Sequence, residues 1–260
     1  MNIRSIARKP FFDFLFLQPF MPQLLRIAMS DALTFNPKIE TTGPRAHFNF
    51  NKFRKLKVNS GLNNAFKIVK EIKEEGNHIT ERLSISDLIQ LGGASAVEYC
   101  GGPFIDLKVG RQDLEDEHFL ADSTSFPELE MSSSDIRAKY SEQGFSDELI
   151  VALFGYRTLG FVSNKDDHKE ERWTRNPWVF DNNYFEELLD QNSPYVKTGS
   201  DLALVNDNEF IKWVETFARN QNHFFDSFVQ AYQKMSELGN IRLLGENTSY
   251  LNVELCEDKI

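Results

Sequence analysis

The chain is poor in several residue types, and each scarcity excludes a class of protein. Only Cys100 and Cys256 are cysteines among 260 residues, so no disulfide framework holds the fold and a reducing compartment is expected. Acidic residues outnumber basic ones by 39 to 29, and the net charge of −10 argues against nucleic-acid binding, which needs a basic face. The apolar run near the N-terminus is interrupted by Asp13, Pro19 and Pro22, well short of the ~20 residues of a membrane span.

The residues that are present describe an ordinary globular protein with an aromatic interior. Apolar residues make up 41% of the chain, charged residues 26%, and phenylalanine alone accounts for 23 positions. The first ten residues contain basic side chains and no acidic one, which leaves open a remnant of a targeting peptide. The alternative is an amphipathic first helix that buries its Phe and Leu side chains.

Apolar residues recur at helical spacing over most of the chain, which predicts an all-α protein. Ser84 or Ser86 is the expected N-cap of a helix that is apolar almost all round, and Ser146 is that of a later one. Gly76 and Gly239 are expected to end two others. Residues 101–146, rich in Gly, Pro, Ser and acidic residues, are predicted to form a loop. The expected helices lie within residues 22–35, 59–76, 84–102, 145–155, 180–191, 207–220 and 222–239.

Seven segments, taken in order, resemble the intracellular class of haem peroxidases, which comprises ascorbate and cytochrome c peroxidases, and ascorbate peroxidase most of all. The resemblance runs from Pro22 to Gly239 and implies a single haem-peroxidase domain over residues 1–260. Its two helical lobes, residues 1–140 on the distal side and 141–240 on the proximal side, would flank a haem cleft, followed by a tail of residues 241–260. The segments are "LLRIAMSDALTF", "NSGLNNAFKIVKEIK", "ISDLIQLGGASAVEYCGGP" leading to "VGRQD", "DELIVALFGYRTLG", "RWTRNPWVFDNNYFEELL", "SDLAL" and "FVQAYQKMSELG".

On the distal side of the haem, the family places an arginine and, four residues later, a histidine preceded by an aromatic residue. The histidine is the general acid–base for peroxide cleavage and the arginine stabilises developing charge. The matching positions are Arg26, Ser30 and Met29. Because a serine hydroxyl cannot serve as an acid–base catalyst near neutral pH, the resemblance predicts that peroxide cleavage by this route is badly impaired.

On the proximal side, Arg157 stands where the family has the histidine that ligates iron. A guanidinium has donors but no lone-pair acceptor, so it cannot be an axial ligand. The family's aspartate and tryptophan partners of that histidine remain as Asp201 and Trp173. We expect Arg157 to pair with Asp201, the Trp173 indole to donate to the same carboxylate, and the arginine to fill space that a haem would use. No catalytic or cofactor-binding residue is then expected.

Two further positions differ from the family. Its ascorbate-binding arginine corresponds to Asp166, and a histidine near the haem propionates corresponds to Ser163. Tyr156 is an alternative haem ligand, as a phenolate beside an arginine. An α-helical path, however, places it about 100° round the axis from Arg157.

A cation site is the one functional constellation that the resemblance retains. Ascorbate peroxidases hold a proximal cation, usually potassium, and oxygen ligands from two loops suit potassium or calcium. The alternative is that these residues only cap helices and pin a turn. The matching ligands are Thr158, Thr174, Asn176, the carbonyl of Val179 and Asp181.

The remaining candidates have simpler interpretations. Cys100 is expected to be a buried small hydrophobe, and residues 115–117 a solvated acidic loop. Five histidines are expected to lie on loops or helix faces in surface roles, at no metal-ligand spacing: His47, His78, His118, His168 and His223.

Two functions from different classes follow. One is a haem-free, catalytically inactive protein that serves as a structural or interaction module in a larger protein assembly, as the resemblance to haem-lacking ascorbate-peroxidase-like proteins of plastids implies. The other is a haem-dependent peroxidase that removes hydrogen peroxide with an atypical iron ligand. An intracellular location is expected, in a mitochondrion, a plastid or the cytoplasm.

Overall fold

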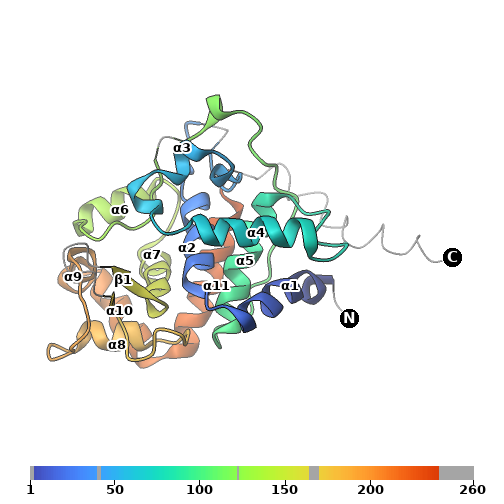
Figure 1. Ribbon diagram of the computed structural model, residues 1–260. Coiled ribbons are helices and arrows are strands. Elements are labelled where there is room, and N and C mark those ends of the chain that lie inside the picture. The colour runs from blue at the N-terminus through green and yellow to red at the C-terminus, as the bar shows by residue number, and fades with distance from the viewer. Residues whose placement is uncertain (1–2, 40–41, 122, 164–169, 240–260) are drawn as a thin grey trace.

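A computed structural model describes residues 3–39, 42–121, 123–163 and 170–239 (Figure 1). Helices dominate this part of the chain, and the all-α prediction is confirmed. The α-helices are α1 (Ile3–Leu17), α2 (Met21–Ala32), α3 (Asn51–Arg54), α4 (Asn63–Glu75), α5 (Ile85–Tyr99), α6 (Ser133–Ser141), α7 (Asp147–Phe154), α8 (Asn183–Leu189), α9 (Gly199–Asn206), α10 (Phe210–Arg219) and α11 (Gln221–Glu237). Four short 3-10 helices are η1 (His47–Asn49), η2 (Lys57–Asn59), η3 (Glu117–Phe119) and η4 (Gly155–Thr158).

The α2–α5 pair forms the centre of the first half of the chain, with α1 and α4 packed on α5 (Figure 1). α5 is buried almost all round, as its apolar sequence predicts, and Ser84 caps it by accepting a hydrogen bond from the Asp87 amide at 2.9 Å. Gly93 permits the close approach of α2, because a Cβ there would lie 2.6 Å from that of Ala28. These contacts set the position of α2 and its polar residues.

The second half gathers α7, α8 and α10 around α11, which also contacts α2 and so joins the two halves. Phenylalanines fill this interface: the ring of Phe224 lies 5.5 Å from that of Phe180, 4.9 Å from Phe185 and 5.8 Å from Phe217. Gly155, where α7 passes into η4, lets the Phe224 ring approach the backbone closely. Phenylalanine side chains therefore contribute to the packing of the helices around η4.

α1 confirms part of the amphipathic interpretation of the N-terminal region, since it is a helix that buries some of its Phe and Leu side chains. Ala7, Phe11 and Leu15 are buried on α5, while Phe16 and Leu17 are 79% and 76% exposed. No helix in the described ranges is both long and apolar enough to cross a membrane.

Two local features differ from the sequence prediction or add to it. Residues 101–146 are not all loop, because α6 lies within them, capped by Ser132, whose side chain accepts a hydrogen bond from the Asp135 amide. The described residues also contain one short antiparallel sheet, in which β1 (Phe161–Ser163) pairs with β2 (Glu170–Arg172). The predicted caps Ser84, Ser146 and Gly76 are confirmed.

Candidate functional site

The Arg157 side chain ends in a fully buried polar network directly after α7. It lies on η4 with 0% exposure, and its Nη1 donates to the Asp201 carboxylate and, at 3.0 Å, to Thr198 Oγ1. Its Nε donates to Tyr156 Oη at 3.2 Å. Burial alone would lower the pKa of Arg157, but Asp201 and two neighbouring tyrosines outweigh it and hold the pKa well above its usual value. The guanidinium is therefore a permanent cation.

Asp201 is the acceptor around which this network is built. Its Oδ2 accepts hydrogen bonds from the Trp173 indole at 3.2 Å and from the Thr198 amide at 2.7 Å. Its Oδ1 accepts one from Tyr184 Oη at 2.5 Å, in addition to that from Arg157. Asp201 and Thr198 form the capping box of α9, so local helix geometry fixes the carboxylate in place. The predicted contacts of Arg157 and Trp173 with Asp201 are confirmed.

On α2, the polar side chains face η2. Ser30, 1% exposed, donates to Asn59 Oδ1 at 2.5 Å, and Asn59 donates in turn to the Phe53 carbonyl at 2.9 Å. Arg26 Nη2 donates to the Val58 carbonyl at 3.3 Å. The spacing of four does place Arg26 and Ser30 on one helix face, as the sequence predicts.

Two aromatic side chains connect the α2 face to the Arg157 network. The Arg26 guanidinium lies 5.9 Å from the centroid of the Phe126 ring, which lies 5.2 Å from that of Tyr156. Both rings are only 4% exposed. Burial lowers the pKa of Arg26; Tyr156 opposes that shift, and Arg157 adds to it. Side chains thus occupy the region between Arg26 and Arg157.

Tyr156 makes a contact with Arg157 that residue spacing does not predict. Successive residues are turned about 100° from each other on an α-helix and about 120° on a 3-10 helix such as Gly155–Thr158, so the two side chains leave the axis in different directions. Both side chains are long enough to meet nevertheless, and the Tyr156 hydroxyl accepts a hydrogen bond from the Arg157 guanidinium. Tyr156 therefore belongs to the same buried network as Arg157.

The residues of this region do not fit a haem. Arg157 has no lone pair for iron, and its donors are engaged by Asp201, Thr198 and Tyr156. Ser30 offers no acid–base group near neutral pH. The Phe126 and Tyr156 rings lie between Arg26 of α2 and Arg157 of η4 and are both buried. The network can hold η4 to α9 but lacks groups for proton transfer to peroxide.

The predicted cation ligands lie close together beyond η4. Thr158 Oγ1 donates to Asp181 Oδ1 at 3.0 Å and to the Val179 carbonyl at 3.4 Å, and Thr174 Oγ1 donates to the Thr158 carbonyl at 3.1 Å. Asn176 instead accepts a hydrogen bond from the Trp178 amide within its own turn, at 3.2 Å. Four of the five positions therefore form one cluster of oxygen atoms.

The histidines are more varied than the sequence analysis predicts. His78 and His118 are exposed. The predicted surface position of His47 is wrong. This side chain is fully buried against Phe53, with its Nδ1 3.4 Å from Asp31 Oδ1. Its burial comes from the close packing of η1 on the core, which local sequence does not encode. His168 and Asp166 lie outside the described residues.

Cys100 and the acidic loop behave as predicted. Cys100 is buried, and burial raises the pKa of its thiol to about 12, which makes it an inert small side chain. Residues 115–117 are exposed. Ser163 ends β1.

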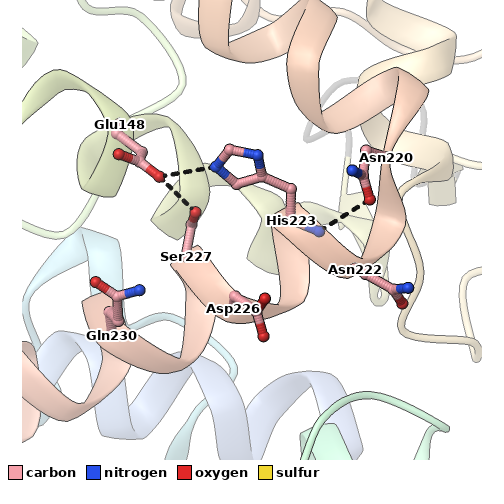
Figure 2. A pocket seen from close by; sticks show the side chains of 7 residues that line it. All are labelled: Glu148, Asn220, Asn222, His223, Asp226, Ser227 and Gln230. Carbon is pink, nitrogen blue, oxygen red and sulfur yellow. Dashed lines mark hydrogen bonds and ion pairs between the residues drawn. The ribbon is translucent and has the colours of Figure 1, made fainter.

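A polar surface pocket of about 390 Å³ lies between α7 and α11, and Arg157 is not among the residues that line it (Figure 2). Ser227 donates to Glu148 Oε1 at 2.7 Å, and His223 Nε2 lies 3.2 Å from the same oxygen. Because the serine bonds to the carboxylate and not to the histidine, no activated nucleophile is formed. In the described part of the chain, no three His, Cys, Asp or Glu side chains are grouped as metal ligands. The contacts join α7 to α11.

Several residues of the site have no strong sequence signal. Asn59, Phe126 and Tyr184 come from elements distant in sequence and could be found only from the fold. Thr198 is different, because a threonine three residues before Asp201 is the pattern of a capping box.

Comparison with known proteins identifies the family. The sequence profile of the peroxidase family matches residues 18–220. The probable peroxisomal L-ascorbate peroxidase 3 of Oryza sativa subsp. japonica is 35% identical over 84% of this chain and 73% of its own length. The peroxisomal L-ascorbate peroxidase 5 of Arabidopsis thaliana is also 35% identical, over 84% of this chain and 76% of its own length. The cytosolic L-ascorbate peroxidase 1 of Oryza sativa subsp. indica is 36% identical, over 84% of this chain and 85% of its own length. With its helical fold and the order of its segments, the chain belongs to the peroxidase family, in the intracellular class that includes the ascorbate peroxidases.

Proposed function

We propose that this peroxidase-family protein is haem-free and catalytically inactive, and that it serves as a structural or interaction module. The observation that carries the proposal is the buried pair of Arg157 and Asp201. A carboxylate that would orient an iron-ligating histidine instead neutralises a cation, and the pair is closed off from solvent. Ser30, bonded to Asn59, supports the same conclusion, because it offers no group to move a proton between peroxide oxygens.

The direct test is haem content. We expect protein expressed with added haem precursor to lack a Soret band and to show no peroxide-dependent oxidation of ascorbate. Near-stoichiometric haem in the purified protein would overturn the proposal.

A pair of substitutions tests whether Arg157 itself prevents binding. Arg157→His supplies a lone-pair donor beside Asp201, and it is expected to give a weak Soret band after titration with hemin. Arg157→Leu removes the same cation without supplying a ligand, and it is expected to give none. Equal haem uptake by both variants would show that an iron ligand at position 157 is not what decides haem binding.

A second candidate function is supported by the position of Tyr156. Its hydroxyl accepts a hydrogen bond from the Arg157 guanidinium, an arrangement that would stabilise a phenolate iron ligand. Such a haem-dependent peroxidase would have to displace the Phe126 ring. If the wild type binds haem, Tyr156→Phe should abolish the binding, whereas the matched Tyr195→Phe should leave it unchanged.

We further propose a potassium or calcium ion at Thr158, Thr174, Asn176, Val179 and Asp181. The clustering of four of these positions supports it. In this proposal the ion stabilises the fold around η4 and takes no part in a reaction.

An intracellular location and a protein partner complete the proposal. The relatives are named as cytosolic or peroxisomal enzymes, which supports an intracellular home. A protein without catalytic groups acts through what it binds, so a larger protein assembly is the expected context and a nucleic acid is not. Fractionation of cells and native gel analysis would test both statements.

A further inference from the structure

Residues 41–70 carry a positive charge that the net charge of the chain conceals. They contain seven Lys or Arg residues and no Asp or Glu, whereas the whole chain has a net charge of −10. All 39 acidic side chains therefore lie outside this segment. Such an imbalance matters only if the fold keeps the cations together at the surface.

The fold does keep them together. Arg54, the last residue of α3, and Lys70 on α4 lie near the same side chain: their charged groups are 5.5 Å and 5.2 Å from the centroid of the Phe66 ring. Lys67 is one turn before Lys70 on the surface of α4. The cationic face is defined here as Arg54, Lys55, Lys57, Lys67 and Lys70, of which the four lysines are exposed and Arg54 is half-buried.

A sixth cation adjoins this face from α2. Arg26 donates to the carbonyl of Val58, the residue that follows Lys57 in η2. Arg26 is half-buried, and that is its one hydrogen bond in the described part of the chain. The positive potential of the face therefore extends inward beside η2.

The residues that the structure describes form no ion pair with these cations. Among the residues that the structure describes, no carboxylate oxygen lies within 4.0 Å of a charged nitrogen of the cationic face or of Arg26. Lysines elsewhere do have partners, such as the exposed Lys212 with Glu209 at 2.7 Å and the half-buried Lys139 with Glu128 at 3.3 Å. Clustered like charges without counter-charges repel one another, and a bound anion would relieve that repulsion.

We propose that the cationic face is the docking surface for an acidic segment of a partner protein. The inference deepens the proposed function, on which it rests, by naming the chemical class of the partner. Several Glu or Asp side chains in one short segment would pair with the lysines of α4 and of the α3–η2 connection together. The association would be fast and strongly dependent on salt, as expected for exposed complementary charges.

Other polyanions fit this face less well. Single-stranded nucleic acid needs exposed aromatic rings for stacking, but Phe48, Phe53 and Phe66 are buried in the core and Phe50 is half-buried. A lipid surface needs exposed apolar side chains beside the cations, and no large exposed hydrophobic residue lies within the described residues 42–70. A long polyanion would also meet the acidic remainder of the molecule. A short acidic peptide covers only the cationic face.

The test uses a fluorescein-labelled peptide of ten glutamates and the full-length protein, with binding followed by fluorescence anisotropy at low salt. The charge reversal Lys55→Glu/Lys57→Glu is compared with Lys139→Glu/Lys212→Glu, which changes the net charge equally on exposed helix surfaces elsewhere. We expect the first pair to weaken binding at least about tenfold and the second less than about twofold. Raising the salt to about 0.3 M should weaken wild-type binding strongly. Unchanged melting temperatures confirm that both variants fold.

Three results would overturn the inference: no saturable binding of the peptide, equal weakening in both double variants, or tighter binding of decauridylate RNA or of phosphatidylserine vesicles than of the peptide. An absorbance spectrum of the same sample distinguishes a failure of the docking-surface inference from a failure of the proposed function. A Soret band would refute the haem-free proposal whether or not the peptide binds.

Discussion

The Asp201 carboxylate accepts hydrogen bonds from four residues that come from four separate parts of the chain. Arg157 lies on η4 and Trp173 directly after β2. Tyr184 lies on α8, and Thr198 is the N-cap of α9. Burial, followed by the charge of Asp201, raises the pKa of Tyr184 well above its usual value, so the phenol remains a donor. One carboxylate therefore satisfies donors that would otherwise be buried without partners.

We predict that Asp201→Ala destabilises the protein by ~3–5 kcal/mol, because it leaves the Arg157 guanidinium buried without a counter-charge. Urea denaturation followed by circular dichroism measures the change. The double variant Arg157→Met/Asp201→Leu removes both charges and should recover much of that loss. An Asp201→Ala protein within ~1 kcal/mol of the wild type would contradict the role assigned to the pair.

At the scale of elements, Arg137 joins α6 to two other helices. Its guanidinium pairs with Asp147 in the first turn of α7 at 3.0 Å and with Asp207, between α9 and α10, at 2.8 Å. The same group lies 4.1 Å from the Phe210 ring centroid. Hydrogen bonds from Arg137 hold the pKa of Asp207 well below its usual value. Asp207 consequently favours the folded state only when ionised.

This arrangement predicts an acid-sensitive contribution to stability. Because the folded-state pKa of Asp207 is lowered, its contribution is fully present above the unfolded carboxyl pKa of ~3.9 and is lost as the pH falls towards the folded value. Asp207→Asn should therefore be less stable than the wild type at neutral pH by about 1 kcal/mol, the scale of a partly exposed ion pair. The difference should shrink towards zero near pH ~2.

Denaturation midpoints measured across pH test this prediction. Glu142→Gln, which removes an exposed carboxylate just after α6, serves as the control and should show a smaller difference from the wild type at every pH. A difference between Asp207→Asn and the wild type that stays constant from neutral to acid pH would refute the assigned ion pair.

At the scale of the whole molecule, the cluster around Asp181 connects the segment after α7 to the one that leads into α8. Asp181 accepts from Thr158 and from the Asn183 amide, both at 3.0 Å. An ion at these oxygens would bind only the folded protein, because the unfolded chain does not bring them together. Such binding stabilises by RT ln(1 + [L]/Kd), or about 2.7 kcal/mol at a hundredfold excess over Kd.

We therefore predict a melting temperature that rises with potassium or calcium beyond the effect of matched ionic strength. The rise should disappear in Asp181→Ala, whereas the matched Asp190→Ala should keep it. Identical melting curves in potassium and in a bulky organic cation would show that these residues only form a turn.

Much of the helical framework is predictable because its causes are local. Ser84 and Ser146 cap their helices, and Gly76 ends another, through contacts within one turn of chain. α6 is not predicted from the sequence, because its nine residues bury only Ile136 and Tyr140, which are too few for a clear periodic pattern. The expected helices also leave out the short helices α3 and α9, so length and apolar spacing separate the helices that can be predicted from those that cannot.

The sequence by itself determined which chemistry is absent at the site. Arginine at position 157 cannot ligate iron and serine at position 30 cannot act as an acid–base near neutral pH, whatever the fold around them, because these are properties of the functional groups. The pairing of Arg157 with Asp201 could also be inferred, since a buried guanidinium requires a carboxylate.

Only the tertiary structure decided what surrounds those groups. The Tyr156 hydroxyl meets the Arg157 guanidinium, and Phe126 lies against Tyr156 from a segment thirty residues earlier. His47 is buried, and Arg54 of α3 and Lys70 of α4 lie beside the same Phe66 ring, through packing between elements that are separate in sequence. Burial and electrostatic neighbourhood depend on which segments meet in space, and residue spacing along a single chain carries no record of that.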